Sequence, residues 1–329
     1  MSRSYKTKTI KTVAPKENII QIPDVVSRVK KAKIAITTPA EIPDIIGSKF
    51  FFIFICVFNL VGLYTVMNLK KTYNFLKNLP IKINKLYINK TRKKIIITNK
   101  SNKLKLFDPV TNLDKSFEKY IRILINKNFP HDSIFGEEYK DKKGNNGFSW
   151  FIDPIDGTKK FIIDVPTWAN LIGFCYEKKP LLGLANFPEL KKFYINDLDK
   201  SYLFKNKKRF KLKTSNNDSF KHLNIVANFH GYLSNKDKLK IVKKFGSALR
   251  LESFDALNYC LLAEGKLDAV IECNLKSFDI LPLIPIIKNS GGVVTNWGNK
   301  SINSGGNVVA SCNMKLHKKI IKILRPFKD

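Results

Sequence analysis

Two aspartates three residues apart, Asp153 and Asp156, follow an apolar run that is typical of a strand. Pro154 fixes the φ angle between them and Gly157 permits a sharp turn, so both carboxylates can point into one small volume. Carboxylate oxygens are the ligands that Mg²⁺ prefers, although an isolated pair at a turn more often serves as a turn or helix cap. The pair is therefore a candidate metal site that needs further ligands.

Two other acidic groups also fall at predicted loop positions. Glu137 and Glu138 follow Gly136, and Asp279 begins a segment with a helical pattern. Each has an ordinary alternative, which is a solvated loop for the glutamates and an N-cap for the aspartate. The chain has only 27 acidic residues against 59 Lys and Arg. Three acidic groups at such positions therefore favour a shared function over coincidence.

Alternating helical and strand patterns after residue 67 would position these carboxylates, and they predict a layered α/β protein. Neither a P-loop nor a dinucleotide-binding glycine fingerprint is present. The predicted helices cover 115–128, 256–263 and 279–289, the last with Pro282 in its first turn, and the predicted strands cover 149–152, 171–176, 181–186, 267–272 and 293–295.

The first part of the chain has a different composition. Residues 1–49 are basic and read as a poorly ordered extension, and 50–67 is an uncharged, mostly apolar run just long enough to cross a thin bilayer. Lys and Arg are denser after this run, so a membrane-spanning segment would anchor the remainder to the inner face of a membrane. Alternatively, Met67 is the natural start and 1–66 a mis-assigned extension. We predict a cytoplasmic domain over 67–329 in either case.

The charge, the cysteines and the histidines argue against a specific nucleic-acid partner, a disulfide or zinc site and histidine catalysis. The net charge of +32 is spread along the chain without one basic stripe, which favours compositional bias over a specific nucleic-acid partner. It would still draw in an anionic substrate. The five cysteines are scattered and indicate buried apolar residues rather than disulfides or a zinc site. The four histidines show no catalytic spacing, and we expect them to play no part.

The acidic motifs, in order, resemble those of the inositol-monophosphatase superfamily of metal-dependent, lithium-sensitive phosphatases. This resemblance runs from about residue 70 to the C-terminus and implies a layered α-β-α-β-α sandwich of the inositol-monophosphatase / fructose-bisphosphatase type, two or three Mg²⁺ ions and a homodimer. The motifs that carry it are Asp108-Pro-Val-Thr-Asn-Leu-Asp114, Gly136-Glu137-Glu138, Asp153-Pro-Ile-Asp-Gly-Thr158, Phe278-Asp279 and Gly291-Gly292-Val293-Val294.

The resemblance also implies roles for single residues. Metal ions would be held by Glu137, Asp153, the carbonyl of Ile155, Asp156 and Asp279. Thr158 would orient the attacking water with support from Asp114, while backbone N–H groups of Gly157 and Thr158 would receive the phosphate. The sequence departs from the family after Asp279, where Ile280-Leu281-Pro282 replaces small residues. That change affects the expected packing of the helix and not the aspartate.

The alcohol part of the substrate is expected to contact Ser253, Asp255 and Glu272. The segments Lys159-Lys-Phe161 and Glu272 to Asp279 resemble the histidinol-phosphate phosphatases of histidine biosynthesis. The two acids would pair with the cationic groups of histidinol phosphate through charge-assisted hydrogen bonds. Inositol 1-phosphate is the alternative substrate, followed by fructose bisphosphate and a nucleotide 3′-phosphate. Outside this class, the chain would be an inactive basic binding protein.

Overall fold

A computed structural model describes residues 69–90, 94–100, 107–219 and 222–327. The chain divides into two units, Met1–Thr72 and Tyr73–Asp329, and the strands and helices labelled below belong to the second. The predicted basic extension 1–66 and the apolar run 50–67 lie outside the described residues. Within the described ranges, no helix is both long enough and apolar enough to cross a membrane.

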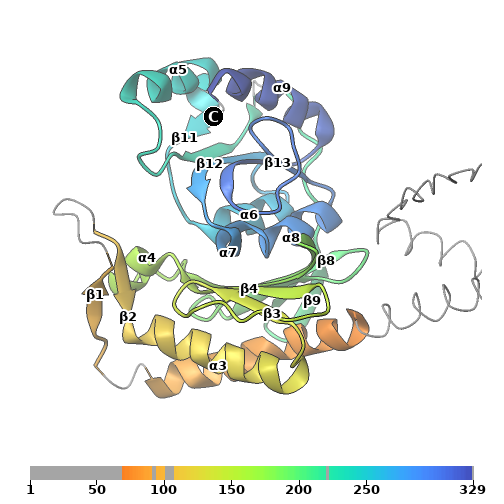
Figure 1. The fold of residues 1–329 in the computed structure, drawn as a ribbon. Helices are drawn as coiled ribbons and strands as arrows, with labels where there is room; N and C mark the ends of the chain where they lie inside the picture. Colours follow the sequence, from red (N-terminus) through yellow and green to blue (C-terminus); the bar gives the residue numbers. More distant parts are fainter. Residues whose placement is uncertain (1–68, 91–93, 101–106, 220–221, 328–329) are drawn as a thin grey trace, which may run out of the picture. The chain divides into compact units, whose positions relative to one another are not determined.

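A seven-stranded sheet forms the centre of the second unit (Figure 1). Its first two strands are parallel, and each later strand pairs with its predecessor in antiparallel fashion. Residues on both faces of β4 and β5 are buried, which explains their nearly continuous apolar sequences. The strand order is β3 (Ser133–Gly136), β4 (Phe148–Asp156), β5 (Ala169–Tyr176), β6 (Lys179–Phe187), β7 (Lys192–Asn196), β8 (Ser201–Lys205) and β9 (Lys208–Lys211).

Two helices cover the outer face of this sheet. One is described over 69–90, and its residues Leu76, Leu79 and Ile83 are buried at helical spacing. The other, α3 (Asn112–Asn128), starts with a capping box between Thr111 and Asp114. A short antiparallel pair, β1 (Ile97–Asn99) and β2 (Pro109–Thr111), leads into α3.

The second sheet has five strands in the order β11-β10-β12-β14-β13. One face packs on the helices between the two sheets, and the other packs on α5 and α9 (Figure 1). The strands are β10 (Ile225–Asn228), β11 (Leu249–Arg250), β12 (Ala269–Leu275), β13 (Val293–Asn296) and β14 (Gly306–Ser311), the helices between the sheets are α6 (Ala256–Ala263), α7 (Ser277–Ile280) and α8 (Leu283–Ser290), and the outer helices are α5 (Asn235–Phe245) and α9 (Met314–Leu324).

The predicted α-β-α-β-α sandwich is confirmed by this layering. The prediction of one helix over 279–289 is wrong, because α7 ends at Ile280 and α8 begins at Leu283. Pro282 lies at the break, where it lacks the N–H that a continuous helix would need. The expectation for the cysteines is confirmed where it can be followed, since Cys175, Cys260, Cys273 and Cys312 are free and buried.

Candidate active site

The parallel pairing of β3 and β4 brings two predicted metal ligands to one sheet edge. Gly136, at the end of β3, pairs with Ile152 of β4, so Glu137 and Asp153 follow at neighbouring positions. β4 then continues to Asp156 through an irregularity in its register with β5. Carboxylates that are well separated in the sequence are therefore delivered to the same end of the sheet.

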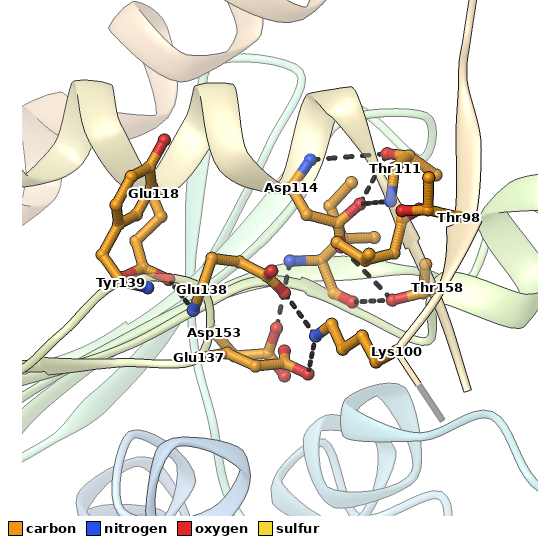
Figure 2. Close-up of polar contacts among 12 residues, drawn as sticks. Thr98, Lys100, Thr111, Asp114, Glu118, Glu137, Glu138, Tyr139, Asp153 and Thr158 are labelled. Atoms are coloured by element: carbon orange, nitrogen blue, oxygen red, sulfur yellow. Dashed lines mark hydrogen bonds and ion pairs between the residues drawn. The ribbon is translucent and has the colours of Figure 1, made fainter. Parts of the chain in front are cut away.

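The turn after β4 orients a candidate water-binding hydroxyl. Gly157 has φ 84°, a left-handed conformation that glycine adopts without strain, and α4 (Thr158–Ile162) begins directly after it. The backbone N–H of Ile155 donates to Asp153 Oδ1 at 3.0 Å. Thr158 Oγ1 lies 3.0 Å from the carbonyl oxygen of Ile155 and 3.4 Å from Asp114 Oδ1 (Figure 2). The single hydroxyl proton can be donated to only one of these acceptors at a time, and the carbonyl of Ile155 is the nearer; the supporting role of Asp114 stays a prediction.

The other side of the site comes from the second sheet and the helices beside it. Glu272 lies in β12, and Asp279 lies in α7, where its Oδ2 accepts a 2.6 Å hydrogen bond from the N–H of Lys276. The N–H of Ala256, the first residue of α6, donates to Asp156 Oδ2 at 2.8 Å. This hydrogen bond joins the strand end that carries the aspartate pair to the helix layer between the sheets.

These segments enclose a pocket of about 730 Å³. Asp114 is the one predicted site residue that does not line it, because it lies behind Thr158. The predicted residues that the pocket brings together are Glu137, Asp153, Ile155, Asp156, Gly157, Thr158, Ser253, Asp255, Glu272 and Asp279.

Burial and mutual repulsion make the acidic cluster costly to charge. Burial, followed by the charges of Glu137, Asp156 and Asp279, raises the pKa of Asp153 well above its usual range. Burial and the charge of Asp255 do the same to Asp156. Burial raises the pKa of Asp279 to about 7. Nearby carboxylates that resist ionisation in this way require a cation to be stable in their charged form.

The donor set suits Mg²⁺. It consists of carboxylate oxygens and a strand-end carbonyl, which are hard ligands. Within the part of the chain that the structure describes, no three His, Cys, Asp or Glu side chains are close enough together to form a ready-made metal cage. Mg²⁺ does not require one, because it usually keeps several waters and binds through one or two carboxylates and the phosphates of its substrate.

Five basic side chains line the pocket, and the contacts that three of them make with its acids were not predicted from the sequence. Lys100 Nζ donates to Glu137 Oε1 at 2.7 Å and to Glu138 Oε1 at 2.5 Å (Figure 2). Lys160 pairs with Asp255. His230 also lines the pocket, so the expectation that the histidines stand apart from the site is wrong for this one. Each of these residues comes from a different part of the chain, and no spacing in the sequence links it to its partner.

Glu272 and Tyr259 present unpaired polar atoms to the pocket. Both residues are 2% exposed, yet Glu272 Oε1 and the Tyr259 hydroxyl form no hydrogen bond within the described residues. His230 Nε2 is 3.8 Å from Glu272 Oε1, beyond hydrogen-bond range. Burial raises the pKa of both Glu272 and Tyr259; the nearby Glu272 raises that of Tyr259 further, whereas the nearby His230 and Tyr259 partly offset the rise in the pKa of Glu272. Buried polar atoms are normally satisfied, so these two indicate a subsite for a polar group of a ligand.

Ser253 and Asp255 are already engaged with the protein. Asn228 Nδ2 donates to Ser253 Oγ at 3.0 Å, and Ser253 Oγ donates to Asp255 Oδ1 at 2.9 Å. The other oxygen of Asp255 accepts from Lys160. Of the three residues predicted to hold the alcohol, Glu272 is therefore the one with a buried oxygen left to bind it.

A buried glutamate, also missed from the sequence, holds the segment that carries Glu137. Glu118 of α3 is 0% exposed and accepts hydrogen bonds from the N–H groups of Glu138 at 2.7 Å and Tyr139 at 3.2 Å. Its charge is paired with Arg122 at 2.7 Å. A helical Glu and Arg four residues apart give only a weak signal in the sequence, because such pairs are common on exposed helix faces.

Comparison with known proteins agrees with this fold and pocket. The sequence matches the inositol monophosphatase family over residues 68–328. It is 31% identical to the bifunctional phosphatase IMPL2, chloroplastic, of Arabidopsis thaliana, over 71% of this chain and 69% of that protein. It is 32% identical to a fructose-1,6-bisphosphatase/inositol-1-monophosphatase of Aquifex aeolicus (68% and 84% covered) and 32% identical to a histidinol-phosphatase of Chlorobaculum parvum (62% and 79% covered).

A solved structure gives the same result for the fold. An IMPase/NADP phosphatase complexed with Mg²⁺ and phosphate superposes with a TM-score of 0.64 at 20% identity, over 78% of this chain and 95% of that one. The chain belongs to the inositol monophosphatase family, as its acidic motifs indicated, and it is a phosphatase of that family.

Proposed function

We propose that this phosphatase hydrolyses histidinol phosphate to histidinol with Mg²⁺, as a step of histidine biosynthesis in the cytoplasm. One observation carries the choice of substrate. Glu272 offers a buried carboxylate oxygen that makes no hydrogen bond and has only a 3.8 Å contact with His230 Nε2, beside the Tyr259 hydroxyl, which also makes no hydrogen bond within the described residues. An ammonium or imidazole N–H of the substrate would satisfy the carboxylate through a charge-assisted hydrogen bond.

The acidic side of the pocket would hold the metal. Glu137, Asp153 and the carbonyl of Ile155 would bind one ion, and Asp153, Asp156 and Asp279 would bind a second. When bound, Mg²⁺ lowers the pKa of a coordinated water and stabilises charge on the phosphate and the leaving oxygen. The carboxylates thereby gain the cation that their burial demands.

The chain's own groups would complete the reaction geometry. The hydroxyl of Thr158, held between Ile155 and Asp114, would orient the attacking water by hydrogen bonding. The backbone N–H groups of Gly157 and Thr158 would bind phosphate oxygens. On the alcohol side, Glu272 would bind the cationic group, with Tyr259 beside it. The Ser253–Asp255 turn would close that side of the pocket.

Inositol 1-phosphate is the second candidate. Glu272 and Tyr259 would also satisfy hydroxyl groups, and Asp255 is already neutralised by Lys160, which reduces the attraction for a substrate cation. The pocket would therefore favour a cationic substrate over an uncharged polyol less strongly than a pocket with two free acids would. The family resemblance further leads us to propose a homodimer. For the location of the full chain, the two alternatives are the cytoplasm and the inner face of a membrane, with anchoring through 50–67.

Phosphate release from a substrate panel tests the proposal. The purified chain is assayed with histidinol phosphate, inositol 1-phosphate, fructose 1,6-bisphosphate and adenosine 3′,5′-bisphosphate, with Mg²⁺ and with a chelator. We expect Mg²⁺-dependent release with the highest kcat/KM for histidinol phosphate, and none from Asp153→Asn. A preference for inositol 1-phosphate would replace the substrate and keep the metal site. No release from any ester by folded protein would refute the proposal.

A further inference from the structure

Lys100 holds the carboxylate that the proposed metal site needs. It directly follows β1, and its backbone N–H donates to the carbonyl oxygen of Asp108 at 2.7 Å, which fixes the residue beside the pocket. Its ammonium lies between Glu137 and Glu138, 2.7 and 2.5 Å from one oxygen of each (Figure 2). A monovalent cation of the protein itself therefore occupies the position next to Glu137.

The ion pair is partly shielded from water. The side chain of Lys100 is 26% exposed and that of Glu138 only 3% exposed. The charge of this ammonium is therefore screened less than that of a lysine on the surface.

We propose that Lys100 is a built-in competitor of Mg²⁺ for Glu137, stabilising the metal-free enzyme and leaving Glu137 when the metal binds. The inference rests on the proposed metal site. The Glu137 oxygen that accepts a 2.7 Å hydrogen bond from the ammonium could coordinate Mg²⁺ at about 2.1 Å only through its other lone pair, which would place the two cations about 4 Å apart, where they repel each other. Binding through the other oxygen of Glu137 would leave two cations only about 4–5 Å apart, where they repel each other.

Glu138 provides the alternative partner that makes the exchange practicable. Its backbone N–H is bound to Glu118 Oε2 at 2.7 Å, which keeps the residue in place. Its own carboxylate is already a partner of Lys100. The ammonium can therefore release Glu137 and remain paired with Glu138, so that neither group is left buried and uncompensated.

Direct measurement of metal binding tests the competition. The metal-stripped full chain is titrated with Mn²⁺, followed by electron paramagnetic resonance, and with Mg²⁺ by calorimetry, for the wild type, Lys100→Met, Lys100→Arg and Lys159→Met. Lys159 lines the same pocket, so its variant makes the same change in charge without removing the ion pair. We expect Lys100→Met to bind the first ion about three- to tenfold more tightly, Lys100→Arg to resemble the wild type, and Lys159→Met to change affinity less than about twofold.

Thermal unfolding gives a second readout that does not depend on activity. Lys100→Met leaves Glu137 and Glu138 without their cation, so the metal-free variant should unfold at a lower temperature than the wild type and gain more from Mg²⁺. Unchanged or weaker metal affinity in folded Lys100→Met would overturn the proposed competition. If the wild type still binds metal in that case, the proposed function stands. An equal gain in metal affinity in Lys159→Met would overturn the competition too, because it would show a general effect of removing positive charge from the pocket. Absence of saturable binding to the wild type would overturn both.

Discussion

Lys160 of α4 and Asp255, the residue before α6, form an ion pair at the pocket. The pair joins the segment after β4 of the seven-stranded sheet to the helix layer between the sheets. It also balances the charge of one of the two acids expected to recognise the substrate. Glu272, the other acid, keeps a buried oxygen that makes no hydrogen bond among the described residues and has only a 3.8 Å contact with His230 Nε2. The two acids are therefore not equivalent.

This difference predicts unequal effects of removing each charge. Glu272→Gln should raise KM for histidinol phosphate about tenfold or more, because a charge-assisted hydrogen bond to the substrate is lost. Asp255→Asn should raise it only about two- to threefold, since Lys160 already neutralises that carboxylate in the free enzyme. Steady-state phosphate release measures both. With inositol 1-phosphate, which carries no cation, the effect of Glu272→Gln should be smaller. A larger effect of Asp255→Asn than of Glu272→Gln would contradict this assignment.

The same pair illustrates what the sequence can and cannot predict. Asp153 and Asp156 were identified because a short contiguous motif carries them and a patterned strand precedes them. The reach of Lys160 to Asp255 depends on how two sheets pack, and no local pattern contains that information. Lys100 and His230 were missed for the same reason. Each enters the pocket from a segment whose own composition is ordinary for this lysine-rich chain.

Secondary structure was predictable where one periodicity ran without interruption. The helix predicted over 256–263 has those bounds in α6, and the helix predicted over 115–128 begins three residues earlier in α3, at its capping box. The helix over 279–289 was wrong because apolar spacing continues across Pro282 while the backbone hydrogen bonding does not. Periodicity reports which face is buried, and it does not report where a helix breaks.

Removing one central carboxylate should make the metal-free protein more stable. In Asp153→Asn the buried charge is lost, while the amide oxygen can still accept from the N–H of Ile155. Burial and repulsion by Glu137, Asp156 and Asp279 raise the pKa of Asp153, so its ionised form opposes folding. We expect the unfolding temperature in chelator to rise by a few degrees and the rise produced by Mg²⁺ to disappear. A lower unfolding temperature with retained stabilisation by Mg²⁺ would refute a metal role for Asp153.

A buried histidine far from the pocket predicts part of the acid sensitivity. His317 of α9 is 0% exposed, and its ring nitrogens lie 2.9 Å from Thr295 Oγ1 and 3.1 Å from Ser311 Oγ. Burial lowers the pKa of His317 to about 4. The unfolded chain therefore binds the extra proton first as pH falls, so this contribution to stability is complete above about pH 6.5 and is lost between about 6.5 and 4.

Chemical denaturation at several pH values measures this contribution. The wild type should lose up to about 3 kcal/mol of unfolding free energy from this residue over that window. His317→Gln keeps a hydrogen-bonding side chain without the titration, so the unfolding free energy of the wild type should fall relative to that of the variant as pH falls from 6.5 to 4. A difference that stays constant with pH would show that His317 does not titrate in this range.

The segment carrying Glu137 should be sensitive to a change that touches no substrate. At Gly136, a Cβ atom would lie 2.2 Å from Glu118 Oε1, so Gly136→Ala must displace the carboxylate that binds the N–H groups of Glu138 and Tyr139. Overpacking of this kind costs about 1–3 kcal/mol of stability. Glu138 and Tyr139 directly follow Glu137, so their displacement should also shift this proposed metal ligand. We expect weaker binding of the first Mn²⁺ ion and a lower kcat, with KM for the phosphate ester changed less.

Gly298→Ala is the matched control for this variant. There the nearest atom to a new Cβ is the side-chain oxygen of Asn296 at 3.3 Å, and neither residue lines the proposed active site. This control should leave Mn²⁺ affinity within about twofold of the wild type, well below a tenfold change, which corresponds to 1.4 kcal/mol. Glu118→Gln, which keeps the shape but loses the charge, should weaken Mn²⁺ binding in the same direction as Gly136→Ala. Wild-type affinity in both variants would mean that Glu118 holds the loop for stability alone and does not position Glu137.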